Sequence, residues 1–388
     1  MKTKESYFLS QPHQPFFLLG IVNAIIMMLL FALNYKGILP LKIDPLTLHS
    51  YSLIYLVFTN FFTGFLFTTF PRFNQTDTID KGYYTKIFYA NAVASLLFIL
   101  GALFSNYLLT FAMLTAFISQ FFIILKLTLI YKNANTPDKE DSFWILGANH
   151  IGLLTHLLFI ISLFVPALLN AAINGAFYLY LIFLAFSVGQ RMIPFFSHSF
   201  AQKGEHFVRN VFILFVLKSI FSTSELKGLE LFVDLTLALY LGREFYRWEL
   251  HPFHSPAILW ILHLALLWLP LSFALSALSL TAELFLDTSF YFLNIHLLAI
   301  GFLTTVLIGF GTRVTLGHAG MPPHADKFVT AIFLFIQLVV VLRALFSINI
   351  AFGWGANFLF DISFTAWLLL FVLWGSRYGK ILILGRKI

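Results

Sequence analysis

Histidine and arginine are the side chains of this sequence best suited to chemistry, because the 388 residues include twelve histidines and no cysteine. The absence of cysteine excludes disulfides, iron–sulfur clusters and thiolate-bound haem or copper. A transition metal would therefore need His, Met, Asp or Glu ligands. The stretch 290–327 is the most informative, since His296 lies inside an apolar run that ends on Arg313 and His318. An imidazole inside an apolar run is costly in lipid and predicts a functional role.

Three histidines besides His296 lie in or at the ends of other apolar segments, namely His49, His156 and His263. His49 begins the second segment at its outer end. His296 itself lies about 12 Å below the outer surface at 1.5 Å per residue. His263 enters from the inner side to a similar depth, and His156 lies near the midplane of the fifth segment. One such histidine would equally suit a hydrogen bond to a neighbouring helix. Three of them, His156, His263 and His296, favour cofactor ligation.

A second group of candidate residues lies at the inner face. Arg191 and Arg313 suit either charge anchoring at the membrane surface or binding of a haem propionate, and both interpretations stay open. His318 and Met321 occupy a proline-stiffened loop and could bind a soft metal such as Cu(I). The remaining loop histidines are expected to be solvated: His13, His198, His206, His251, His254 and His324.

The elements that position these residues are predicted to be membrane helices. Hydrophobic residues make up 60% of the chain and charged residues 11%, which excludes a soluble domain of this length. We expect an all-α bundle of about twelve transmembrane helices forming one integral membrane domain over 1–388, with tails at 1–15 and 376–388. The seventh and eighth segments are the least secure, because both are short and carry charges. The predicted segments are 16–35, 48–70, 86–104, 107–130, 143–165, 171–195, 206–222, 227–242, 255–280, 288–311, 327–347 and 355–375.

Charge placement predicts the orientation of this bundle. With the N-terminus inside, about three quarters of the 24 basic residues fall in inner loops and tails, so both termini are expected in the cytoplasm. The formal charge of +7 therefore indicates topology and not nucleic-acid binding. No loop is long enough for a soluble catalytic domain, so chemistry would take place in or at the membrane. Gly301, Thr305 and Gly309 form a ridge of small residues that predicts close packing against another helix.

A haem would suit the intramembrane histidines and the inner arginines. Haem iron takes one or two imidazoles, which facing helices of a bundle can supply, and its propionates favour Arg or Lys near an aqueous face. No spacing in the chain fixes such a site uniquely.

Several motifs resemble the NnrS family of polytopic membrane proteins. The stretch Gly309, Arg313, Val314, Leu316, Gly317 and His318 is similar to that family's G-x-x-x-R-V-x-L-G-H ending. Further similar stretches are Gln14-Pro15-Phe16-Phe17-Leu18, Gly64-Phe65-Leu66, Gly189-Gln190-Arg191 with Pro194-Phe195-Phe196, Trp260-Ile261-Leu262-His263-Leu264 and Trp268-Leu269-Pro270. His156 falls where the family has a histidine late in its fifth span.

The second segment departs from the family. His49 matches the first histidine of the motif W-H-x-H-E, but Tyr51 and Ser52 stand at its second histidine and glutamate. The resemblance implies a haem- and copper-containing protein of the cytoplasmic (inner) membrane that acts in the response to nitric oxide, and this departure puts the metal content of the segment in doubt. The implied haem ligands are some pair among His49, His156, His263 and His296, with Arg191 and Arg313 assisting. His318 is the best copper candidate, and His263 and His296 are further candidate metal ligands.

The first functional class is a haem protein that binds nitric oxide and works with a respiratory electron-transfer partner. Within this class, an open axial position on the iron would suit a scavenger or reductase, and two filled axial positions would suit an electron carrier or assembly factor. Two other functional classes stay open. A secondary transporter could line a substrate or proton path with the midplane histidines. Against that reading, Asp234, Asp287 and Asp361 are expected near segment ends or in the uncertain eighth segment, away from the membrane interior. A structural partner of a respiratory complex, without any cofactor, is the third possibility.

Overall fold

The structure is a computed structural model that describes residues 7–199, 201–250 and 252–385, and these residues contain helices and loops but no strand. Several α-helical and π-helical segments run into one another without a break, so the described residues form twelve long helical rods. The elements in chain order are η1 (Tyr7–Leu9), α1 (His13–Tyr35), α2 (Pro45–Tyr51), η2 (Ser52–Phe58), α3 (Thr59–Phe73), α4 (Lys81–Phe104), α5 (Asn106–Lys132), α6 (Glu140–Ser162), η3 (Pro166–Leu168), α7 (Leu169–Asn174), η4 (Gly175–Ile182), α8 (Phe183–Phe196), α9 (Phe207–Thr223), α10 (Lys227–Arg247), α11 (Ala257–Leu286), α12 (Leu293–His296), η5 (Leu297–Thr304), α13 (Thr305–His318), α14 (Lys327–Phe352) and α15 (Phe358–Leu384).

The rods occur at the twelve predicted segments. Ten of them are long and apolar enough to cross a bilayer, which makes the chain a multi-pass membrane protein. The other two are α9 and α10, the segments whose charges made the prediction least secure. The predicted C-terminal tail is largely helical, since α15 continues to Leu384. Of the predicted tails, residues 1–6 and 386–388 lie outside the described residues.

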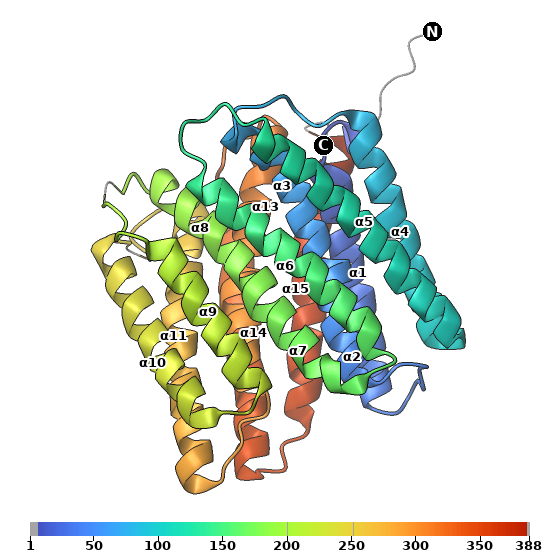
Figure 1. Cartoon of the computed structure of the whole chain (residues 1–388), viewed down its shortest axis with the longest axis vertical. Helices are drawn as coiled ribbons and strands as arrows, with labels where there is room; N and C mark the ends of the chain where they lie inside the picture. The colour runs from blue at the N-terminus through green and yellow to red at the C-terminus, as the bar shows by residue number, and fades with distance from the viewer. Residues whose placement is uncertain (1–6, 200, 251, 386–388) are drawn as a thin grey trace. The chain divides into compact units, whose positions relative to one another are not determined.

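The helices group into two compact units. Unit 1 contains the chain up to Phe177 with Val314–Pro322 and the stretch from Phe371 onward, and unit 2 contains Tyr178–Arg313 and Pro323–Leu370. In unit 1, α4 packs along α5 and α1 packs along α3 (Figure 1). In unit 2, α10 packs along α11 (Figure 1). The α11 helix also packs along η5. The prediction of one integral domain stays a prediction.

Local sequence signals set several helix starts. The side chains of Asp44, Asp80, Ser105 and Asp326 each accept a hydrogen bond from the backbone N–H three residues on, and so cap α2, α4, α5 and α14. Each cap satisfies an N–H group that lacks a partner within the helix. Such caps matter at a membrane boundary, because unsatisfied backbone groups are costly near lipid.

Three of the rods contain a π-helical segment, namely η2, η4 and η5. Threonine hydroxyls at the ends of two of these segments bond carbonyls five residues back. Thr59 donates to Ile54 O at 2.8 Å, and Thr304 donates to Ala299 O at 2.7 Å. The wider turn changes the direction in which the side chains before and after it point. Such π-bulges are frequent at functional sites.

The predicted ridge of small residues packs as expected within unit 2. A Cβ atom added to Gly301 would lie 2.6 Å from the Trp268 ring, and one added to Gly309 would lie 2.7 Å from Leu262. The ridge therefore lies directly against α11. These two contacts also fix the register, since Trp268 is level with Gly301 and Leu262 is level with Gly309.

Candidate functional site

His156 is the centre of a buried polar cluster in unit 1. Its side chain is 1% exposed, and its ring stacks on Tyr55 with ring centroids 3.9 Å apart. Its Nδ1 lies 2.7 Å from Gln120 Oε1, and its Nε2 lies 2.8 Å from the Tyr51 hydroxyl. Because Gln120 Oε1 can only accept, Nδ1 carries the hydrogen, and Tyr51 therefore donates to Nε2.

This cluster does not fit a haem. Both ring nitrogens of His156 already have partners, and Tyr55 and Phe117 cover the ring. The adjoining cavity, lined by Asn60, Asn91 and Gln120 among others, holds about 10 Å³, which is room for about one water molecule. Asn91 donates to Asn60 Oδ1 at 2.9 Å beside it. The arrangement is a buried polar core in which both nitrogens of His156 are satisfied and Gln120 Nε2 has no hydrogen-bond partner among the described residues.

His49 and His156 are not placed to bind the same iron atom. Its ring packs against Phe31 with ring centroids 4.2 Å apart. It lies two residues before Tyr51 in the α2 rod, and at about 100° per residue the two side chains point roughly 200° apart. Since Tyr51 faces His156, His49 points to the other side of its helix.

His263 forms a second cluster, at one end of unit 2. The side chain is 2% exposed, and its Nε2 lies 2.7 Å from Ser197 Oγ. The neighbouring Phe196 ring lies beneath the Arg313 guanidinium, whose carbon is 3.9 Å from the ring centroid. Phe196 also contacts Phe310 with centroids 6.3 Å apart. His263 of α11 and Arg313 of α13 thus contact consecutive residues, Ser197 and Phe196, at the C-terminal end of α8.

His296 lies far from this cluster, although it belongs to the same unit. His263 is next to Leu262, which is level with Gly309, and thirteen residues (309 − 296) separate Gly309 from His296. At 1.5 Å per residue the two histidines are about 20 Å apart along the helices, too far to share one iron. His296 is half-buried, and its Nδ1 lies 2.8 Å from Phe292 O. That bond orients the imidazole, as the carbonyl partners of metal-binding histidines do.

Arg191 lies on α8 but faces away from this cluster. Gly189 faces α11, because a Cβ added there would lie 3.6 Å from Leu266. Arg191 follows Gly189 by two residues and points roughly 200° away from it. Arg313, in contrast, contacts Phe196, the residue next to the Ser197 that bonds His263.

His318 pairs with a histidine that was expected to be solvated. The prediction for His13 was wrong: its side chain is 1% exposed, and its ring centroid lies 4.7 Å from that of His318. His318 Nδ1 lies 3.0 Å from Val314 O, and its Nε2 is 3.4 Å from Arg72 Nη2. The burial of His13 follows from the close approach of α1 to α3, where a Cβ added to Gly64 would lie 3.2 Å from His13 Cα.

The other loop histidines follow the prediction, since His198, His206, His254 and His324 are exposed. His251 lies outside the described residues. Within 7–199, 201–250 and 252–385, no three or more His, Asp or Glu side chains group as a metal site would require. The predicted metal set of His318, His296 and His263 is therefore not gathered at one point. Two imidazoles, His13 and His318, are the closest approach to a metal site among the predicted loop residues.

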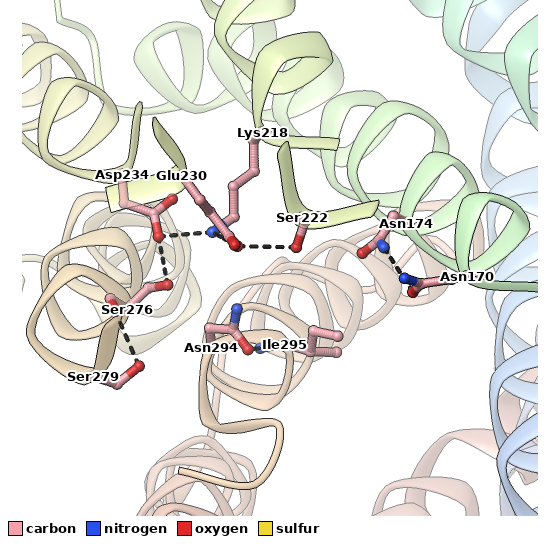
Figure 2. Close-up of polar contacts among 10 residues, drawn as sticks. All are labelled: Asn170, Asn174, Lys218, Ser222, Glu230, Asp234, Ser276, Ser279, Asn294 and Ile295. Carbon is pink, nitrogen blue, oxygen red and sulfur yellow. Dashed lines mark hydrogen bonds and ion pairs between the residues drawn. The ribbon is translucent and has the colours of Figure 1, made fainter. Parts of the chain in front are cut away.

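A buried ionic cluster in unit 2 includes Asp234, which lies in α10, the eighth predicted segment. Lys218 and Asp234 are 0% exposed, and Lys218 Nζ lies 2.7 Å from both Asp234 Oδ2 and Glu230 Oε1 (Figure 2). Glu230 and Asp234 are four residues apart on α10, so both face α9. The sequence could have indicated this cluster, because two acids spaced four residues apart in one segment follow a lysine in the preceding apolar segment.

Comparison with known proteins identifies one family. The family model described as NnrS protein matches residues 7–386, nearly the whole chain. A search of curated proteins gives no match. The matched region includes all of unit 2, nearly all of unit 1 and every candidate residue described above.

Proposed function

The chain belongs to the NnrS family, and on that premise we propose that it is a haem-containing protein of the cytoplasmic membrane that acts in the response to nitric oxide or nitrosative stress. The helical bundle is consistent with this role, since cofactor sites in such bundles are built from inward-facing side chains. A respiratory electron-transfer protein in the same membrane is the partner that we propose for a reductase or an electron carrier.

The observation that carries the proposal is the cluster of His263, Ser197 and Arg313. His263 is buried, as an imidazole that ligates iron in an apolar setting must be, and Ser197 orients its ring. The Arg313 guanidinium lies on Phe196, beside Ser197 at the C-terminal end of α8, and is suited to bind a haem propionate. Bound haem would supply an iron that binds nitric oxide and exchanges electrons. His263 would hold the iron, Arg313 would anchor the propionate edge, and the phenylalanines would exclude water.

Haem content of purified variants tests this assignment. His263→Ala should lose most of the haem retained by the unmodified protein during detergent purification, measured by the pyridine haemochromogen assay per mole of protein. The matched control is His254→Ala, which removes an exposed histidine of the loop that precedes α11. Full haem content in His263→Ala, with both variants monodisperse, would remove His263 from the site.

Copper is the second proposed cofactor, and its ligands would be His318 and His13. The bond from His318 Nδ1 to the Val314 carbonyl makes Nε2 the ligating atom, which copper would reach only by displacing Arg72 Nη2 from its 3.4 Å contact. His13 Nδ1 is buried with no hydrogen-bond partner among the described residues. Two imidazoles suit Cu(I) better than Cu(II), which favours more ligands. The positive charge of Arg72 disfavours a bound cation at this position. Copper content, measured by metal analysis of purified His318→Ala and His324→Ala, shows whether His318 binds copper. Equal copper content in the two variants would contradict the proposal.

A secondary transporter is the second candidate function, because the structure buries Lys218, Glu230 and Asp234 together. Buried acids of this kind are typical of proton-coupled transporters. The visible spectrum separates the two candidates, since a transporter purified from haem-supplied cells would show no Soret band.

A further inference from the structure

The cluster of Lys218, Glu230 and Asp234 does not belong to the proposed haem site, and its charges do not balance. Two carboxylates face one ammonium group, so the fully ionised cluster carries one net negative charge. Lys218 and Asp234 are 0% exposed, and the Glu230 side chain is 7% exposed. An uncompensated charge at such a depth is strongly unfavourable. One bound proton would make the cluster neutral.

The hydrogen bonds identify the carboxyl group that carries this proton. Asp234 Oδ2 accepts from Lys218 Nζ at 2.7 Å and from Ser276 Oγ at 2.6 Å. Asp234 Oδ1 is buried and has no hydrogen-bond partner among the described residues. A carboxylic acid with its hydroxyl at Oδ1 and its carbonyl at Oδ2 leaves one neutral group without a partner, which costs less than the unsatisfied charged oxygen that a carboxylate would leave.

Glu230 is suited to the ionised role. Its Oε1 accepts from Lys218 Nζ at 2.7 Å and from Ser222 Oγ at 2.9 Å (Figure 2). Its side chain is also the more accessible of the two acids. Lys218 and Glu230 therefore form the ion pair, and Asp234 completes the cluster as a neutral acid.

A polar face of α10 connects this cluster to the end of the helix. Lys227 is 42% exposed and pairs with Glu283 of α11, with Nζ 2.9 Å from Oε1. Glu230 and Asp234 follow Lys227 by three and seven residues on the same face, so Asp234 lies about 10 Å along the helix from the exposed lysine. A further titratable group facing the cluster is Tyr178 of η4, whose ring centroid lies 5.6 Å from Lys218 Nζ. Ser276 is the neighbour from α11.

We propose that Asp234 is a proton-binding site that exchanges one proton with bulk water, and that the bound proton makes the cluster of Lys218, Glu230 and Asp234 neutral. No covalent bond other than the carboxylic O–H forms or breaks. The neutral state is Lys218 ammonium, Glu230 carboxylate and Asp234 acid. The charged state lacks the Asp234 proton and bears one net negative charge in the interior of unit 2.

Infrared difference spectroscopy of the full chain in lipid nanodiscs tests the proposal, because a protonated carboxyl group has a C=O stretch separate from that of a carboxylate. The unmodified protein at neutral pH should show one buried-acid band, and Asp234→Asn should lose it. Glu230→Gln should lose it too, since Asp234 then becomes the only counter-ion of Lys218. Lys218→Met should add a second band, because both acids then need protons.

The matched control is Asp287→Asn, which changes an exposed acid at the end of α11 and should leave the band unchanged. Absence of an acid band in the unmodified protein would overturn the proposal, since the cluster would then be fully ionised. Retention of the band in Glu230→Gln would also overturn it, because Asp234 would then be neutral for a reason unrelated to Lys218. The spectrum of the unmodified protein decides the first point even if a variant fails to fold.

Discussion

At the scale of single residues, Tyr51 shows how this chain differs from the family motif it resembles. It stands at the motif's second histidine, and its hydroxyl donates to His156 Nε2 at 2.8 Å. A second imidazole there would offer a metal a pair of nitrogens. The tyrosine supplies a donor, which completes the hydrogen bonds of His156 and makes it a structural residue.

Tyr51→Phe should destabilise the protein by about 1–3 kcal/mol, because it leaves His156 Nε2 buried without a partner. The Tyr51 ring would keep its packing against Phe98, so the loss reports the hydroxyl alone. Thermal unfolding in detergent measures the effect. Tyr107→Phe, at a tyrosine that is 91% exposed, is the control and should leave the midpoint unchanged. Equal midpoints for the two variants would show that the hydroxyl contributes nothing.

Arg313→Gln should lower haem retention several-fold while leaving the fold intact, since it removes the cation proposed to bind a propionate. The haem-to-protein ratio after purification measures this. Arg209→Gln, which changes an exposed arginine of α9, is the matched control. A ratio for Arg313→Gln equal to that of the control would assign Arg313 to packing on Phe196 alone.

Sequence patterns located most of the reactive residues but not their partners. The burial of His156 and His263 followed from their positions inside apolar runs. The pairing of His13 with His318 did not, because it joins residues 305 positions apart (318 − 13) through helix packing. The separation of His263 from His296 likewise depends on the register of α11 against η5 and α13, which hydropathy does not encode.

At the scale of helices, hydropathy predicted all twelve rods, since a run of about 20 apolar residues is sufficient to indicate one. It did not predict the three π-helical segments. An extra residue in a helical turn leaves the apolar pattern almost unchanged. The carbonyls it displaces are satisfied by hydroxyls such as Thr59 and Thr304, and these threonines are otherwise ordinary in a membrane helix.

Gly301→Ala should destabilise unit 2 by about 1–3 kcal/mol, because the new methyl group would overlap the Trp268 ring. The ring cannot easily move, since Trp268 Nε1 donates to Gln337 Oε1 at 2.7 Å. Thermal unfolding gives the change. The control is Gly317→Ala, in the same rod, where an added Cβ meets nothing within 4 Å. A drop in Gly317→Ala as large as that in Gly301→Ala would trace the effect to helix conformation and not to packing.

At the scale of the whole molecule, the segments that resemble the family motifs gather in both units. Unit 1 contains the N-terminal motif, the Gly64 motif and His318, and α1 and α3 meet at Gly64. Unit 2 contains the motifs of α8 and α11 together with Arg313. Each unit thus has its own buried histidine cluster, and beside the cluster of unit 2 lies Arg313, the cation proposed to bind a haem propionate.

The natural absence of cysteine allows a direct test of the predicted orientation. Single cysteines at two exposed positions, Asp287→Cys and His324→Cys, should differ in their reaction with a membrane-impermeant maleimide. Position 287 should label in intact spheroplasts, and position 324 only after permeabilisation, because the basic loops are expected inside. The reverse pattern would invert the topology, and equal labelling of both in intact spheroplasts would contradict an odd number of crossings between them.

The visible spectrum of the purified protein, reduced and then exposed to nitric oxide, tests the proposed function most directly. The proposal predicts a Soret band that shifts when nitric oxide is added to the reduced protein and that is largely lost in His263→Ala. A colourless protein purified from cells supplied with haem would contradict it, and the buried acids of α10 would then favour the transporter.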